Sequence, residues 1–209
     1  MDEFQNNTKY QDILKTAHDL FWKFGIRRVT IEEICREANV SKMTFYKYFR
    51  NKEAIYISVL NHGIELMTDM FRKHTDESES FLEAIETLFD GLTRFTRRYR
   101  PYVEIWVDLS SCSMNRFAAE LSAKVEAEGR KLFRGLIEKA KDKGELDASL
   151  NTDLVTYALD CHMTLFTYSL VSEYHHKRFS AFFKDGLRGP TQKEKIALVV
   201  ESAKLLVES

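Results

Sequence analysis

Apolar residues recur at intervals of three and four along most of the chain, and the strict alternation that marks a half-buried strand is almost absent. Spacing of this kind places apolar side chains along one face of an α-helix. The pattern predicts helices over residues 10–24, 30–38, 41–49, 55–70, 81–99, 102–109, 115–143, 152–170 and 196–207. We therefore expect an all-α protein in which the helices near the N-terminus are short.

Polar residues at the helix boundaries sharpen this prediction near the N-terminus. Thr30 followed by Glu33 has the spacing of a capping box, and Ser41 is suited to begin the next helix. Asn39 lies between them, and asparagine adopts a positive φ at little cost. Two short helices joined by a turn of about three residues predict a helix-turn-helix.

The helix predicted over residues 41–49 has two chemically different faces. At about 3.6 residues per turn, Phe45 and Phe49 fall on the side expected to pack inward. The opposite side carries Lys42, Met43, Tyr46, Lys47 and Arg50, and no Asp or Glu occurs between Ala38 and Lys52.

Charge is distributed unevenly along the chain. Ten Lys and Arg against seven Asp and Glu up to Lys52 give a net charge of +3, whereas the remainder carries −4. A local basic surface on a mildly acidic protein suits a polyanionic partner, because the rest of the surface repels that partner and orients it. The alternative is a solvated helix face that happens to lack acidic residues.

The segment TIEEICREANVSKMTFYKYFRNKEAI, residues 30–55, closely resembles the TetR family of bacterial transcriptional regulators. The resemblance implies an N-terminal three-helix, helix-turn-helix DNA-binding domain, residues 1–52. It also implies a larger helical ligand-binding and dimerisation domain, residues 53–209. The chain departs from the family pattern at Asn39 and Met43, where glycine is common. Asparagine is a conservative change in a left-handed turn, whereas Met43 adds a bulky apolar side chain to the face expected to meet bases.

The candidate contacts to DNA all lie in the helix-turn-helix or immediately after it. Hydroxyl groups at helix N-termini and an ammonium at the start of the following helix suit phosphate oxygens. Lysine suits guanine O6 and N7, and a methionine side chain suits a thymine methyl group. For Tyr48, a half-buried ring with an exposed hydroxyl is an equal alternative to a DNA contact. The candidates are Thr30, Ser41, Lys42, Met43, Thr44, Tyr46, Lys47, Tyr48 and Lys52.

The C-terminal part is expected to bind an effector and to dimerise. By family resemblance, a small hydrophobic or aromatic effector lies among the middle helices, where an apolar cavity with few polar groups suits it. Ordinary core packing is the alternative for each candidate, and no cofactor is expected. Two C-terminal helices with more apolar surface than one subunit hides suggest a homodimer, the alternative being an internal core. The candidates for the effector site are Tyr102, Trp106, Tyr157, Cys161, His162 and Phe166.

These observations favour a DNA-binding transcriptional regulator, with repression as the family habit, a palindromic operator and release by an inducer. A helical protein-binding or ligand-carrier module that does not bind DNA is the alternative. Motifs of nucleotide-binding, zinc-protease and serine-hydrolase sites are absent, so an enzyme is not expected. Cys112, Cys161 and His162 permit a metal or thiol sensor as an alternative, but they lack paired metal-ligand spacing, so no metal site is expected. No run of about 18 apolar residues and no apolar leader occurs, so we expect a cytoplasmic protein without a membrane segment.

Overall fold

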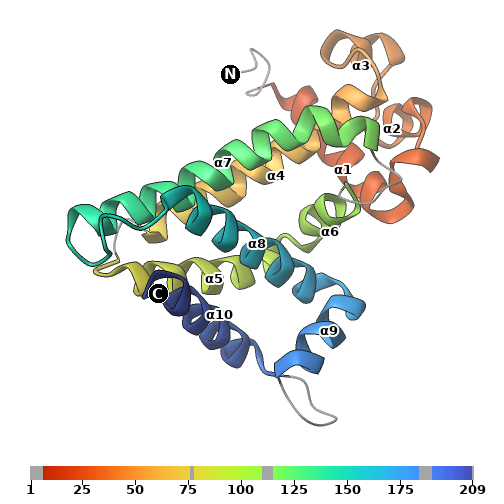
Figure 1. Ribbon diagram of the computed structural model, residues 1–209. Helices are drawn as coiled ribbons and strands as arrows, with labels where there is room; N and C mark the ends of the chain where they lie inside the picture. The colour runs from red at the N-terminus through yellow and green to blue at the C-terminus, as the bar shows by residue number, and fades with distance from the viewer. Residues whose placement is uncertain (1–6, 76–77, 110–114, 184–189, 209) are drawn as a thin grey trace. The chain divides into compact units, whose positions relative to one another are not determined.

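A computed structural model describes residues 7–75, 78–109, 115–183 and 190–208, and all regular structure in these ranges is helical (Figure 1). The predicted all-α class is therefore confirmed. No helix within the described ranges is long and apolar enough to cross a membrane. The helices are α1 (Thr8–Arg28), α2 (Ile31–Glu37), α3 (Lys42–Tyr48), α4 (Lys52–Thr75), α5 (Phe81–Arg98), α6 (Arg100–Leu109), α7 (Asn115–Asp142), α8 (Thr152–Val171), α9 (Glu173–Phe183) and α10 (Gln192–Val207).

Several helices differ from their predicted ranges by a few residues, α4 and α10 among them, and two of the differences have a local cause. Gly25 interrupts α1 with φ 73° and ψ 151°, a conformation that glycine adopts readily, but the chain resumes a helical turn that reaches Arg28. The sequence pattern also missed α9 as a separate helix. Ser172 ends α8 and its side-chain oxygen accepts a hydrogen bond from the His175 N–H at 3.4 Å, so a serine alone marks the junction.

The chain divides into two compact units that do not follow the order of the sequence. The first unit combines Met1–Leu66 with Pro101–Leu121, and the second combines Met67–Arg100 with Ser122–Ser209. Helix α6 thus belongs with the helix-turn-helix, although α5 separates it from α4 in the sequence. Compactness does not test where the DNA-binding function ends, and the predicted boundary after residue 52 stays a prediction.

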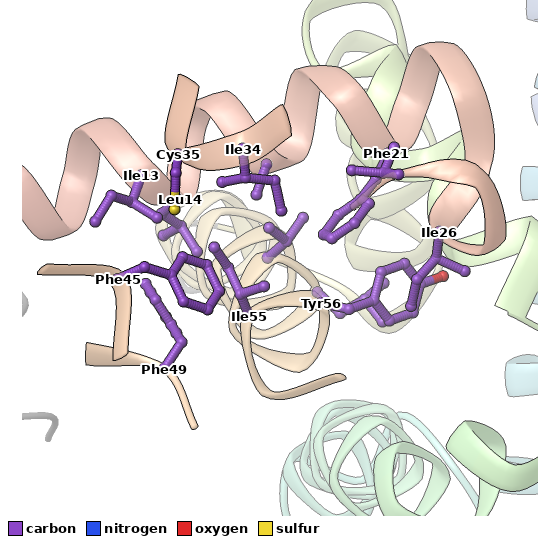
Figure 2. Packing of buried hydrophobic residues seen from close by; sticks show 14 of the residues in the cluster. Ile13, Leu14, Phe21, Ile26, Ile34, Cys35, Phe45, Phe49, Ile55 and Tyr56 are labelled. Atoms are coloured by element: carbon purple, nitrogen blue, oxygen red, sulfur yellow. The ribbon is translucent and has the colours of Figure 1, made fainter. Parts of the chain in front are cut away.

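The core of the first unit holds the three N-terminal helices on the first half of α4. Ile13, Ile34, Phe45 and Ile55, from four different helices, have no exposed surface (Figure 2). Phe49 is 2% exposed and its ring is 5.0 Å from that of Tyr10, centroid to centroid. Burying these side chains is the main term that stabilises such short helices, which are marginal in isolation.

The second unit has its own apolar core, to which α5, α7, α8 and α10 contribute. Phe89 of α5 and Phe166 of α8 pack edge to face, with ring centroids 5.0 Å apart. Lys195 of α10 is also buried, and its ammonium contacts Nδ1 of His176 at 3.0 Å and lies over the ring of Phe179. Burial lowers the pKa of Lys195, because desolvation disfavours its charged form.

Candidate nucleic-acid interface

The N-terminus of α2 is closed by the predicted capping box. The Glu33 N–H donates to Oγ1 of Thr30 at 3.2 Å, and the Thr30 N–H donates to Oε2 of Glu33 at 2.8 Å. The Thr30 hydroxyl also donates to Glu33 at 2.9 Å. These hydrogen bonds lower the pKa of the Glu33 carboxyl. The hydroxyl predicted to meet a phosphate thus already has an intramolecular acceptor, and its role toward DNA stays a prediction.

The turn between α2 and α3 is built as expected from Asn39 and Ser41. Asn39 has φ 51°, in the left-handed region, and the Val40 N–H donates to the carbonyl of Cys35 at 2.9 Å. Ser41 caps α3, accepting a hydrogen bond from the Thr44 N–H at 3.0 Å, and its hydroxyl lies 2.9 Å from that of Thr44. The turn therefore leads from the C-terminus of α2 directly into the hydroxyl-capped N-terminus of α3.

Helix α3 presents the two faces that its sequence predicts. Phe45 is fully buried and lies within the cluster drawn in Figure 2, whereas Met43 is 82% and Tyr46 53% exposed. Lys47 is exposed too, and its ammonium lies 5.6 Å from the ring centroid of Tyr48. The exposed side thus offers an apolar, an aromatic and a cationic group together, which suits base edges and phosphates.

Lys42 has a partner that the sequence pattern concealed. Its ammonium forms an ion pair with the carboxylate of Glu32, which lies ten residues earlier on α2. The hydrogen bond and charge of Lys42 lower the pKa of Glu32, and Glu32 in turn raises the pKa of Lys42. The surface is consequently not free of acidic groups, although residues 38–52 contain none.

Tyr48 and Lys52 also have intramolecular partners. The Tyr48 hydroxyl donates to Oδ1 of Asn7 at 3.0 Å, and its half-buried ring meets the ring of Tyr10 edge to face. The Lys52 ammonium donates to the carbonyl of Val29 at 2.8 Å, which ties the start of α4 to the residue before Thr30. These contacts favour a structural role for both side chains, and a contact to DNA stays a prediction for each.

The six residues predicted for the effector site fall in different compact units. Tyr102 and Trp106 of α6 pack against the core of the first unit, and the Tyr102 ring stacks on His18 with centroids 3.9 Å apart. In the second unit, α8 carries Tyr157, which is 69% exposed, and Phe166, which is 1% exposed.

Cys161 is partly buried, and Nε2 of His162 lies 3.3 Å from the Ser202 hydroxyl. The four residues of α8 therefore do not share one environment. In the described ranges, no three His, Cys, Asp or Glu side chains gather as metal ligands would.

Comparison with known proteins agrees with this geometry. Residues 13–59, which contain α2 and α3, match the family described as bacterial regulatory proteins, tetR family. The chain is 29% identical over 146 residues to YdeS of Bacillus subtilis (strain 168), an uncharacterized HTH-type transcriptional regulator, covering 69% of this chain and 71% of YdeS. A 26% identity to YerO of the same organism spans 63% of this chain and 46% of YerO.

Solved structures share the fold over nearly the whole chain. A TetR-family regulator from Syntrophomonas wolfei superposes with a TM-score of 0.74 at 19% identity, covering 98% of this chain and 97% of its own. FadR from Bacillus subtilis, solved in complex with stearoyl-CoA, superposes with a TM-score of 0.68 at 16% identity, covering 95% and 97%. A capped helix-turn-helix with an exposed basic and aromatic α3, and a family match over residues 13–59, lead to one conclusion: this region is a DNA-binding helix-turn-helix of the tetR family, and the chain as a whole is similar to transcriptional regulators that carry it.

Proposed function

We propose that this protein is a homodimeric repressor that binds a palindromic operator and is released by an apolar effector. The observation that carries the DNA-binding part is the exposed side of α3, where Met43, Tyr46 and Lys47 face solvent while Phe45 is buried beneath them. The N-termini of α2 and α3 add backbone N–H groups and helix dipoles that favour phosphate. Such a regulator acts on chromosomal DNA, so we place it in the cytoplasm.

An exposed apolar stripe on α8 supports the homodimer. Leu154, Tyr157 and Leu165 are 64%, 69% and 47% exposed, and their spacing along the helix puts them on one side. Leu205 of α10 is 70% exposed as well. A two-fold axis through such a surface relates two copies of α3, and therefore two operator half-sites about 34–36 Å apart.

Three buried polar atoms in the second unit support an effector site there. Oγ1 of Thr96, Oγ1 of Thr156 and Nδ1 of His162 have no hydrogen-bond partner. Buried polar atoms are usually satisfied, so each is a candidate contact for the polar atoms of an otherwise apolar ligand. Because FadR of Bacillus subtilis binds stearoyl-CoA, long-chain acyl-CoA thioesters are the first effectors to test.

Contacts of α6 within the first unit support its coupling to the helix-turn-helix. Tyr102 of α6 stacks on His18 of α1, and its Cδ1 atom lies only 2.9 Å from where a Cβ on Gly63 of α4 would be. A shift of α6 therefore displaces the helices that carry the helix-turn-helix. An effector that prefers the shifted state lowers the population that matches the operator spacing.

The test is binding to a labelled duplex that spans the DNA upstream of the protein's own gene, against a scrambled duplex. We expect wild type to bind the upstream duplex more tightly than the scrambled one, and Tyr46→Ala/Lys47→Ala to lose this specific binding. Tyr174→Ala/Lys177→Ala, which removes an exposed tyrosine and lysine from α9, is the matched control and should bind as wild type does.

Salt dependence separates this function from a protein-binding module. Neutralising several phosphates per subunit predicts a steep fall of affinity with salt, with a slope of about −0.9 for each phosphate contacted. Absence of specific binding, both upstream and after unbiased selection of duplexes by a folded dimer, would reject the proposed function.

A further inference from the structure

The ion pair between Glu32 and Lys42 lies across the two helices of the helix-turn-helix. Glu32 belongs to the first turn of α2 and Lys42 is the first residue of α3. Both side chains are more than half exposed, at 61% and 56%. The carboxylate therefore lies on the surface that the proposed function assigns to DNA, beside the N-terminus of the recognition helix.

A carboxylate in this place opposes DNA binding in two ways. It occupies the ammonium of Lys42, which must leave Glu32 before it donates to a phosphate or to guanine. It also repels phosphate oxygens, since two like charges a few ångströms apart in water change an equilibrium by a factor of about three to five. Both effects apply to every DNA sequence, because every duplex carries the same phosphates.

Base edges, unlike phosphates, can compensate for this loss of affinity. A carboxylate accepts a hydrogen bond from cytosine N4, and a released lysine donates to guanine O6 or N7. A G·C pair under the start of α3 offers both partners at once. Only a duplex with a G·C pair at that position thus regains the binding affinity that the Glu32–Lys42 ion pair costs.

We propose that Glu32 is a specificity-determining residue, which withholds Lys42 from the phosphates of arbitrary DNA and releases it at the operator. This inference rests on the proposed function, since it assumes that α3 enters the major groove. It assigns to an acidic residue of α2 a role that the basic composition of residues 38–52 does not suggest.

Glu32→Gln tests the proposal while keeping the shape of the side chain. We expect it to tighten binding of the dimer to a scrambled duplex by roughly tenfold, and to steepen the salt slope on that duplex by about 1 to 2. Affinity for the operator should change less than threefold, so the ratio of operator to scrambled affinity should fall.

Glu37→Gln is the matched control. Glu37 lies on the same helix and the substitution removes the same charge, but its carboxylate contacts Arg36 of α2 and not α3. In a Lys42→Ala background no ammonium is released and only the repulsion remains, so Glu32→Gln should tighten binding to the scrambled duplex by about threefold to fivefold instead of tenfold. Unfolding in urea checks that each variant keeps the wild-type stability.

Several results would overturn the inference. Equal tightening on both duplexes, equal tightening by Glu37→Gln, or an undiminished effect in the Lys42→Ala background would each leave Glu32 without a role in specificity. In all of these cases wild type still binds its operator, and the proposed function stands. If wild type binds no duplex specifically, the proposed function and this inference both fail.

Discussion

Phe45 and Tyr46 are neighbours in α3 whose side chains lie on opposite faces, so truncating each in turn separates stability from DNA binding. Phe45 has no exposed surface and packs among Ile34, Ile55 and Phe49 in the core of the first unit (Figure 2). Tyr46 is 53% exposed. The two substitutions remove rings of nearly equal size from adjacent positions.

The expected magnitudes follow from burial. Phe45→Ala removes a fully buried ring and leaves a cavity, which lowers the free energy of unfolding by about 3–5 kcal/mol. At a urea dependence of about 2 kcal/mol per molar, the midpoint falls by about 1.5–2.5 M. Tyr46→Ala changes stability by no more than about 0.5 kcal/mol, because an exposed side chain loses little packing. The same variant weakens operator binding at least about tenfold.

Urea unfolding followed by circular dichroism measures the first quantity, and retardation of a labelled operator measures the second. Phe45→Leu is the companion variant if Phe45→Ala does not fold, and we expect it to cost about 1–2 kcal/mol. If Tyr46→Ala destabilised the protein as much as Phe45→Ala, the assignment of the two faces of α3 would be refuted. Wild-type operator binding by Tyr46→Ala would refute the role of the exposed face.

Three further variants probe other parts of the first unit. Thr30→Ala removes the capping box and should lower the free energy of unfolding by about 1 kcal/mol, with Thr30→Ser restoring it, as urea unfolding will show. Gly63→Ala places a Cβ 2.9 Å from Cδ1 of Tyr102 and should cost about 1–3 kcal/mol, and Tyr102→Ala should relieve most of this loss in the double variant. Burial lowers the pKa of His18 although Asp19 opposes the shift, so the native state binds fewer protons than the unfolded chain. The contribution of neutral His18 to the free energy of unfolding is therefore complete above the ordinary histidine pKa of about 6.5 and declines as the pH falls below it. Between about pH 7.5 and 5.5, the free energy of unfolding of His18→Phe should fall less than that of wild type.

The helices of the N-terminal region, their caps and their buried faces follow from the order of the residues alone. The capping box of Thr30, the left-handed turn at Asn39 and the burial of Phe45 and Phe49 were all predicted and are all present. Each depends on residues three or four positions apart, or on the conformational preference of one residue. Local geometry of this kind can be predicted from the spacing of residues along the chain.

The partners of the exposed groups, in contrast, become visible only once the helices are packed together. Glu32 of α2 forms an ion pair with Lys42 of α3. Asn7 accepts a hydrogen bond from the hydroxyl of Tyr48, which lies 41 residues later in the sequence. Helix α6 joins the first unit by packing Tyr102 on residues of α1 and α4. These contacts depend on how the helices cross and which side chains then meet, and a helical period along one segment carries no information about either.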